Sequence, residues 1–107
     1  MTALAAPIAR MIEATNAGDT EAFLDCFTPD AYLEDWGRGF TGRDGIASWN
    51  RTDNIGKNAH FEAIGVTGDD THQVVTIVVT GGGYNGTGPI EFDMRDDLIS
   101  RLVISAD

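Results

Sequence analysis

The sequence contains a single cysteine, Cys26, among 107 residues. One thiol cannot form an internal disulfide, which excludes the disulfide-stapled folds of small secreted proteins. The opening segment, MTALAAPIAR, has no basic residues ahead of an apolar run, as a signal peptide would have. These absences favour a reducing compartment, and we expect a cytoplasmic protein.

Basic residues are also scarce, because seven Lys and Arg stand against seventeen Asp and Glu, for a formal net charge of −10. A chain this acidic repels phosphate groups, which excludes binding to nucleic acid or to an anionic membrane through charge. No apolar stretch approaches the roughly 20 residues that a transmembrane helix needs. The expected partner is a neutral or cationic small molecule, or a second copy of the chain.

The first half of the chain predicts helices. A content of 42% hydrophobic residues is enough for one core, and we expect one domain over residues 1–107. Apolar residues recur at helical spacing in three segments. The first follows Pro7 and stops at Gly18, the second is short, with Phe27 on its apolar face, and stops at Pro29, and the third ends near Gly56.

From His60 onward the period changes to that of strands. Strands are predicted over 60–67, 71–80, 90–95 and 98–105, with a loop over 81–89. Helices followed by antiparallel strands are typical of an α+β fold. We expect three N-terminal helices packed on the concave side of a strongly curved, mainly antiparallel β-sheet. The result is cone-shaped, and its open mouth makes a small-molecule pocket.

The stretch from Phe27 to Gly42 carries the sharpest functional clue. Its strand places successive side chains on opposite faces, so Leu33 and Asp35 share one face. If Leu33 faces the core, Asp35 faces the same interior. A carboxylate in an apolar interior is costly unless it has a task or a partner. Asp35 is therefore either a functional acid or a structural one paired with Arg38 or Arg43.

Cofactor and metal motifs are absent from the sequence. Residues 81–86 match G-x-G-x-x-G, but Pro89 and another strand follow them, so no helix N-terminus is available to hold a pyrophosphate. No recognised metal-ligand spacing occurs among the nearby candidates His60, Glu62, Asp70 and His72. We expect no cofactor and no metal.

Four short motifs occur in order along the chain, followed by the C-terminal segment FDMRDDLISRL. They are Asn16-Ala17-Gly18-Asp19, Phe27-x-x-Asp30-Ala31, Glu34-Asp35 and Thr41-Gly42-Arg43-x-x-Ile46. Together they resemble the nuclear transport factor 2-like superfamily. The similarity is greatest to its SnoaL-like (polyketide-cyclase-like) and ketosteroid-isomerase-like branches. The resemblance covers essentially the whole chain and implies the cone-shaped fold, but one fold of this kind hosts many functions.

The resemblance carries over to the active site only in part. Steroid isomerases of this superfamily hold their catalytic base at the end of the first strand, in a Glu-Asp pair, and Asp35 matches that position. Their tyrosine donor on the first helix falls on Met11, and their aspartate donor falls on Ile90, or on Glu91 if a gap intervenes. Such donors usually supply the largest share of the stabilisation, so steroid isomerisation itself is not expected.

We expect Asp35 to project into an apolar cavity as a general base, with His60 as a second catalytic residue. The expected substrate-binding residues are Met11, Ile12, Trp49, Asn50, Tyr84, Phe92 and Leu102. Each has a structural alternative: Trp49 can simply fill the core, His60 can be an edge residue, and Tyr84 can be a solvated aromatic rather than a lid.

Three functions stay open. The first is an isomerase, cyclase or dehydratase that moves a proton on an apolar small molecule bearing a carbonyl. The second is a binding module that holds a similar ligand without chemistry. The third is a homodimerisation module whose outer sheet face, with Ile99 and Val103 on one side of the last strand, pairs with a second subunit.

Overall fold

The computed structural model describes residues 3–105 and divides them into helices followed mainly by strands. The helices are α1 (Ala6–Ala17), α2 (Thr20–Leu24), α3 (Gly42–Asp53) and a 3-10 turn η1 (Ile55–Lys57). The strands are β1 (Phe27–Asp35), β2 (Arg38–Thr41), β3 (His60–Gly68), β4 (His72–Thr80), β5 (Gly86–Arg95) and β6 (Leu98–Ile104).

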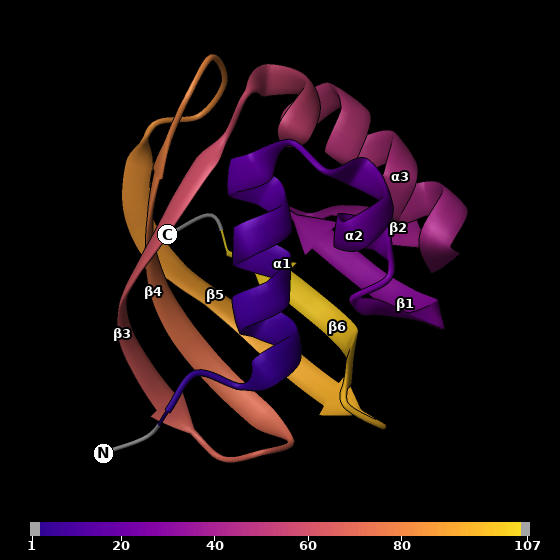
Figure 1. Ribbon diagram of the computed structural model, residues 1–107, viewed down its shortest axis with the longest axis vertical. Helices are drawn as coiled ribbons and strands as arrows, with labels where there is room; N and C mark the ends of the chain where they lie inside the picture. Colours follow the sequence, from indigo (N-terminus) through magenta and orange to yellow (C-terminus); the bar gives the residue numbers. More distant parts are fainter. Residues whose placement is uncertain (1–2, 106–107) are drawn as a thin grey trace.

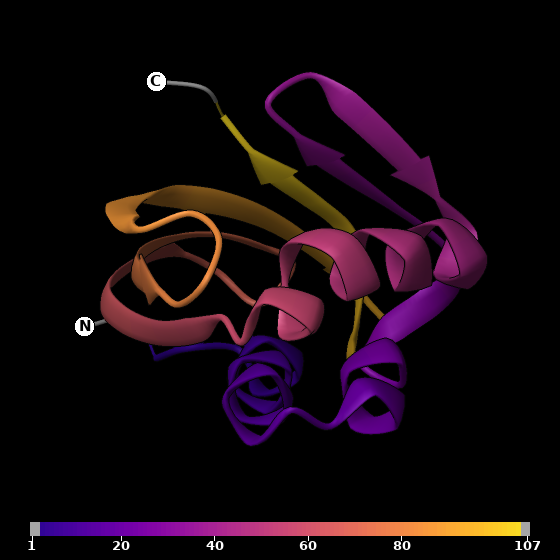
Figure 2. The same cartoon turned by 90° about the horizontal axis from the view of Figure 1, so that it is seen from above.

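The strands form one curved, mixed sheet in the order β2-β1-β6-β5-β4-β3. The β1–β6 pair is parallel and every other pair is antiparallel, so the predicted α+β fold with a mainly antiparallel sheet is confirmed. Figures 1 and 2 show β3, β4 and β5 curling around the helices, which lie on one side of the sheet.

The core lies between α1, α3 and the inner face of the sheet. On α1, Ile8 and Met11 are fully buried, and Gly18 ends the helix in a left-handed conformation with φ of 70°. On β5, Ile90, Phe92 and Met94 are buried while Glu91 and Asp93 are only partly so. This alternation fixes which face of the sheet is inside.

Three predicted boundaries are wrong. The second helix stops at Leu24, and Phe27 opens β1 instead of extending the helix, because its backbone pairs with Ile99 of β6. Arg38–Thr41 was not expected as a strand, yet it pairs with β1 after a tight turn in which Trp36 and Gly37 take positive φ. Strand β5 begins at Gly86, inside the predicted loop, because it pairs with Val79 of β4.

The predicted outer position of Ile99 is also wrong. Its side chain is fully buried, and it pairs with Met94 on the inner face. A bulge between Asp93 and Met94 shifts the register, so Ile99 and Val103 do not share a face although they are four positions apart in the sequence. Val103 pairs with Glu91 and Glu34, and it does lie on the outer face.

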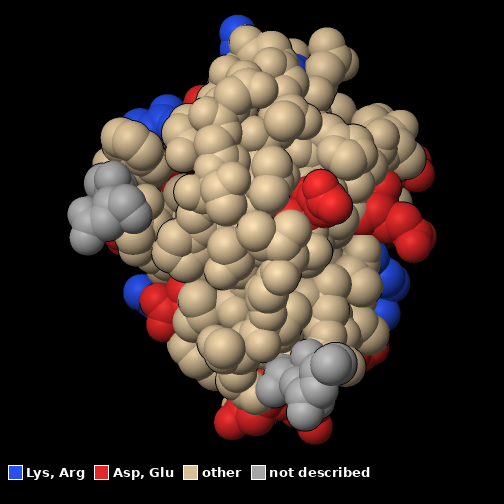
Figure 3. Space-filling view, turned by 90° about the vertical axis from the view of Figure 1, so that its left-hand side faces the viewer, with Lys and Arg blue, Asp and Glu red and all other residues tan. Residues whose placement is uncertain are grey.

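The outer face of the sheet carries charged side chains along its central strands, with Glu91 and Asp93 on β5 and Arg101 on β6. Figure 3 looks onto the side formed mainly by β3 and β4, where uncharged side chains dominate, although an acidic side chain also lies near the middle of the view. Toward one end, His72 lies between two carboxylates, with Nδ1 2.6 Å from Asp93 Oδ1 and Nε2 3.1 Å from Glu91 Oε2. The hydrogen bond to Asp93 raises the pKa of His72, and the charges of Asp93, Glu91 and Asp69 add to the effect.

We predict that His72→Gln destabilises the protein more at pH 6 than at pH 9. The pKa of His72 is raised in the folded state, so its stabilisation is fully present below the unfolded value of 6.5 and is lost as the pH rises through the folded value. Thermal melts across this range measure the effect. His60→Gln, which removes an exposed imidazole from β3, is the control. A difference between the His72 variant and wild type that does not change with pH would contradict the prediction.

Candidate functional site

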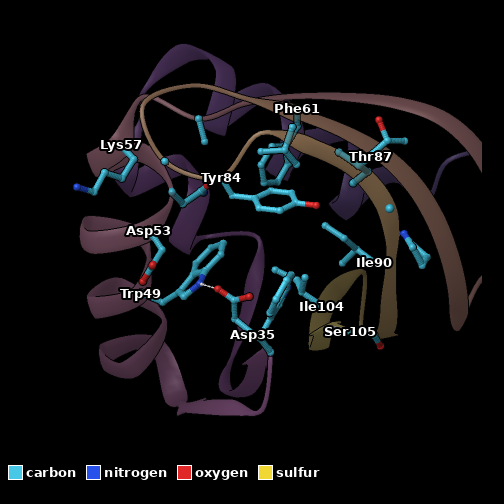
Figure 4. Close-up of a pocket in the computed structure, with 18 of the residues that line it drawn as sticks. Asp35, Trp49, Asp53, Lys57, Phe61, Tyr84, Thr87, Ile90, Ile104 and Ser105 are labelled. Carbon is cyan, nitrogen blue, oxygen red and sulfur yellow. Dashed lines mark hydrogen bonds between the residues drawn. The ribbon is translucent and has the colours of Figure 1, made fainter. Parts of the chain in front are cut away.

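A pocket of 530 Å³ lies between the α3–η1 segment and the inner face of the sheet (Figure 4). Its apolar wall is formed by strand residues that point inward, namely Phe61, Ile77, Val79, Ile90 and Ile104. Polar groups reach the pocket from the β1–β2 hairpin, from the end of α3 and from the start of β5. An apolar chamber with a few polar groups is the usual form of a small-molecule site.

Asp35 is the carboxylate best enclosed by this pocket. Its side chain is 16% exposed, and it ends the buried inner row of β1 two residues after Leu33. The Trp49 indole Nε1–H donates to Asp35 Oδ2 at 2.9 Å, and Arg38 Nη2 donates to the same oxygen at 2.9 Å. Within residues 3–105, no hydrogen bond engages Asp35 Oδ1. One carboxylate oxygen is therefore fixed and the other is available to a ligand.

Arg38 connects this carboxylate to a second one at the pocket mouth. Its Nη2 also donates to Asp53 Oδ1 of α3 at 3.3 Å, and the guanidinium is 54% exposed. The Asp53 carboxylate first, and Asp35 second, raise the pKa of Arg38, so it stays charged. Arg43, the other predicted partner of Asp35, instead donates to the backbone oxygen of Phe27.

Two aromatic side chains meet at the mouth of the pocket. Trp36 follows Asp35 in the β1–β2 turn, and Tyr84 belongs to the glycine-rich loop between β4 and β5. Their ring centroids are 6.3 Å apart at an interplanar angle of 65°. They are 56% and 57% exposed, and both border the pocket.

A buried amide network supports the helical side of the pocket. Asn54 Nδ2 donates to Asn50 Oδ1 at 2.9 Å and to Thr15 Oγ1 at 3.3 Å, which joins the end of α3 to α1. Asn16 at the end of α1 accepts from the backbone N–H of Phe61 and donates to its carbonyl oxygen. The network therefore holds α1, α3 and β3 in one arrangement around Phe61.

The structure brings together three of the predicted site residues, Asp35, Trp49 and Tyr84. His60 does not reach the pocket, because the strand alternation that turns Phe61 inward turns His60 to the exposed side. Asn50 is 1% exposed and its side chain is committed to the amide network.

Four other predicted residues are core residues that do not line the pocket. Met11, Phe92 and Leu102 are at most 1% exposed, and Ile12 packs against the core from α1. Phe92 pairs with Leu102, and the next inward pair along the same strands is Ile90 with Ile104, which does line the pocket. The structure places Phe92 and Leu102 on the inward face of the sheet, two residues along the strands from the pair that lines the pocket.

Several pocket residues were missed altogether. Phe61 alternates with the polar His60 and Glu62, so its inward face was visible in the sequence, whereas Ile77 lies in an apolar run that marks neither face. Nothing marked the end of the sheet that α1 leaves uncovered. The Arg38–Asp53 pair spans 15 residues and has no local sequence signal.

Within the described part of the chain, no group of three His, Cys, Asp or Glu side chains is arranged to hold a metal ion. No helix between residues 3 and 105 is both long enough and apolar enough to span a bilayer.

A family model described as a SnoaL-like domain matches residues 8–102. No curated protein gives a significant match. A Sinorhizobium meliloti protein named as a candidate polyketide cyclase is 27% identical, with a TM-score of 0.82 over 95% of this chain and 95% of that chain. The predicted resemblance is confirmed by these matches.

Two more distant structures share the fold. The Δ5-3-ketosteroid isomerase of a Mycobacterium species is 19% identical, with a TM-score of 0.79 over 92% of this chain and 88% of its own. A Mycobacterium tuberculosis protein in complex with estradiol-17β-hemisuccinate is 13% identical, with a TM-score of 0.80 over 91% and 88%.

We predict that Trp49→Phe lowers the free energy of unfolding by about 1–2 kcal/mol, because it removes the hydrogen bond to a charged, mostly buried oxygen and trims a packed ring. Urea unfolding measures the loss. Trp36→Phe, which trims a half-exposed ring, should change stability much less. Equal losses in the two variants would show that the Trp49–Asp35 bond contributes nothing of its own.

Proposed function

Since the chain belongs to the SnoaL-like domain family, we propose that it binds a small apolar molecule bearing a carbonyl group and moves a proton on it. The ligand occupies the pocket between α3 and the sheet. In this proposal the helices and the curved sheet form a cone, and the pocket is its mouth. The resulting activity is that of an isomerase, a cyclase or a dehydratase.

The observation that carries the proposal is the state of the Asp35 carboxylate. Oδ2 is held by Trp49 and Arg38, so the carboxylate keeps a fixed orientation and a compensated charge in an apolar wall. Oδ1 then takes a proton from a carbon next to the ligand carbonyl, and the electron pair of the C–H bond forms an enolate. When the ligand has a double bond between its β- and γ-carbons, the electron pair is shared with the γ-carbon, and return of the proton there completes an isomerisation with no atom gained or lost.

The enolate oxygen needs a hydrogen-bond donor. Of the polar site residues predicted beside Asp35, which are Asn50, His60 and Tyr84, only Tyr84 borders the pocket. In Figure 4 its ring extends across the pocket and its hydroxyl points toward Ile90. The resemblance implies that the acidic donor of steroid isomerases falls on Ile90, or on Glu91 if a gap intervenes. We assign the role of carbonyl donor to the Tyr84 hydroxyl.

We predict that the protein binds 2-acetylnaphthalene, a flat apolar methyl ketone, and speeds hydrogen–deuterium exchange at its methyl group in D₂O. A general base typically contributes ~10²–10⁴-fold to rate, so Asp35→Asn should remove most of the exchange while binding changes little. Proton NMR measures the exchange, and isothermal titration measures the binding.

Asp30→Asn is the matched control, because Asp30 lies on the same strand and its carboxylate also pairs with an arginine, Arg95, but outside the pocket. It should leave the exchange unchanged. Binding without accelerated exchange by the wild type would favour the alternative, a ligand-binding module without catalysis. Failure of the wild type to bind the ketone would refute the assignment of the pocket.

We also propose that the protein is a homodimer that pairs through the outer face of the sheet. Val74 and Val78 of β4 lie on that face and are partly exposed, whereas Val103 of β6, between Glu91 and Glu34, is only 8% exposed. The part of the face over β3 and β4 is mostly uncharged in Figure 3, in a chain whose net charge of −10 opposes self-association elsewhere. This proposal is compatible with either ligand-based function.

We predict that Val74→Glu converts the dimer to monomer, because it places like charges on both copies of the shared face. Size-exclusion chromatography with light scattering at micromolar concentration measures the mass. Ala9→Glu, which adds the same charge to the exposed side of α1, should remain dimeric. A monomeric wild type would exclude the dimer.

A further inference from the structure

We propose that Tyr84, whose ring lies against Gly86 and contacts Trp36, is a specificity-determining residue that restricts the pocket to flat ligands. The inference rests on the proposed ligand-binding function and names the shape of the ligand. Tyr84 belongs to the loop between β4 and β5, and its ring lies across the pocket between the side chains of Phe61 and Trp49 (Figure 4).

The first observation is that Gly86 makes room for this ring. A Cβ atom at Gly86 would lie 2.4 Å from the Tyr84 hydroxyl oxygen and 2.7 Å from Cζ. No residue with a side chain can stand there while the phenol keeps its position. Gly88 is two residues further on the same strand, and a Cβ there would meet nothing within 4 Å. Of these two glycines, only Gly86 leaves space that the Tyr84 ring occupies.

The second observation is that the loop carrying Tyr84 is held in place. Asn85 accepts from the backbone N–H of Gly81 at 3.1 Å and donates to the carbonyl oxygens of Gly81 at 2.9 Å and Gly83 at 3.1 Å. The N–H of Gly82 donates to the Lys57 carbonyl oxygen at 2.8 Å, which attaches the loop to η1. The phenol is thus carried by an anchored loop and not by a free one.

The third observation is the contact with Trp36 from the opposite side of the mouth. Trp36 takes a φ of 51°, a left-handed conformation that is unfavourable for a bulky residue and is worth attention at a pocket. This conformation directs the indole to the edge-to-face contact with Tyr84, at 6.3 Å between centroids. Trp36 and Tyr84 lie on separate hairpins, so their contact spans the mouth.

A ring held across the pocket limits the thickness of what can lie beneath it. A flat aromatic or conjugated body can pack against the phenol face, whereas a cage-shaped body of similar size must displace it. Aromatic contacts of this kind contribute beyond simple area burial. The ligand that fits is therefore a flat, apolar carbonyl compound.

The test compares two methyl ketones, flat 2-acetylnaphthalene and cage-shaped 1-acetyladamantane, by isothermal titration. We expect the wild type to bind the flat ketone about tenfold more tightly than the cage ketone. Gly86→Ala displaces Tyr84 and Tyr84→Ala removes it, so both variants should bind the two ketones with similar affinity. Gly65→Ala, on β3 outside the pocket, where a Cβ would make only an ordinary contact with Thr76 at 3.7 Å, should keep the wild-type preference.

A measurement without ligand tests whether Gly86 determines the position of the Tyr84 ring. Trp49 is 4% exposed and Trp36 is 56% exposed, so acrylamide quenching of tryptophan fluorescence reports mainly Trp36. Gly86→Ala should increase the quenching because Tyr84 no longer covers the indole, and Gly88→Ala should not.

An unchanged preference in Gly86→Ala and Tyr84→Ala would overturn the inference while leaving the proposed function intact. So would equal quenching in the two glycine variants. Binding of neither ketone by the wild type would instead refute the proposed function, and the ligand role of Tyr84 with it.

Discussion

The hydrogen bond from the Trp49 indole to Asp35 Oδ2 is the interaction on which the site depends. It connects the middle of α3 to the end of β1, two elements that contribute nothing to each other through backbone pairing. The Trp49 indole is held in position for this bond because it also stacks on Phe23 of α2, with 6.3 Å between the ring centroids. Two further polar links, from Arg43 to the Phe27 carbonyl oxygen and from Arg38 to Asp53, also join α3 to the sheet. Together with the Trp49–Asp35 bond they set the distance that defines the pocket.

The same bond decides which part of Asp35 remains available for chemistry. A carboxylate has two oxygens, and here the tryptophan and Arg38 converge on one of them. The charge is compensated by a guanidinium that is half exposed, so the ion pair itself adds little to stability. The consequence of the ion pair is a fixed orientation of the Asp35 carboxylate. The second oxygen stays free beside a pocket whose sheet side is mainly aliphatic, an environment in which a fixed base can act on a weakly acidic carbon.

The two sides of the pocket differ in the kind of side chain that forms them. The strands supply the aliphatic wall through simple alternation, in which Ile90 and Ile104 face inward as a pair. The helical side is held by the buried amides of Asn50 and Asn54, which hydrogen-bond to each other and position α3. Asn54 also lines the pocket, and its Oδ1 has no hydrogen-bond partner among residues 3–105. The loops at the mouth, with Trp36 and Tyr84, are the only elements here that combine large apolar surface with exposure.

The sequence by itself determined the class of fold and the orientation of Asp35. Helix stops at glycine, and the alternation around Leu33 and Phe92, depend on local geometry that neighbouring residues fix. It did not determine the extent of the sheet, because β2 and the start of β5 are strands only by virtue of the partners they pair with. Nor could it separate Phe92 and Leu102, which α1 covers, from Ile90 and Ile104, which it leaves open. His60 was misplaced because strand alternation turns it to the exposed side, and Ile99 was misplaced because a bulge shifts the register of its strand. Alternation specifies a face, but only tertiary packing of helices on the sheet decides which part of that face is filled and which part is a pocket.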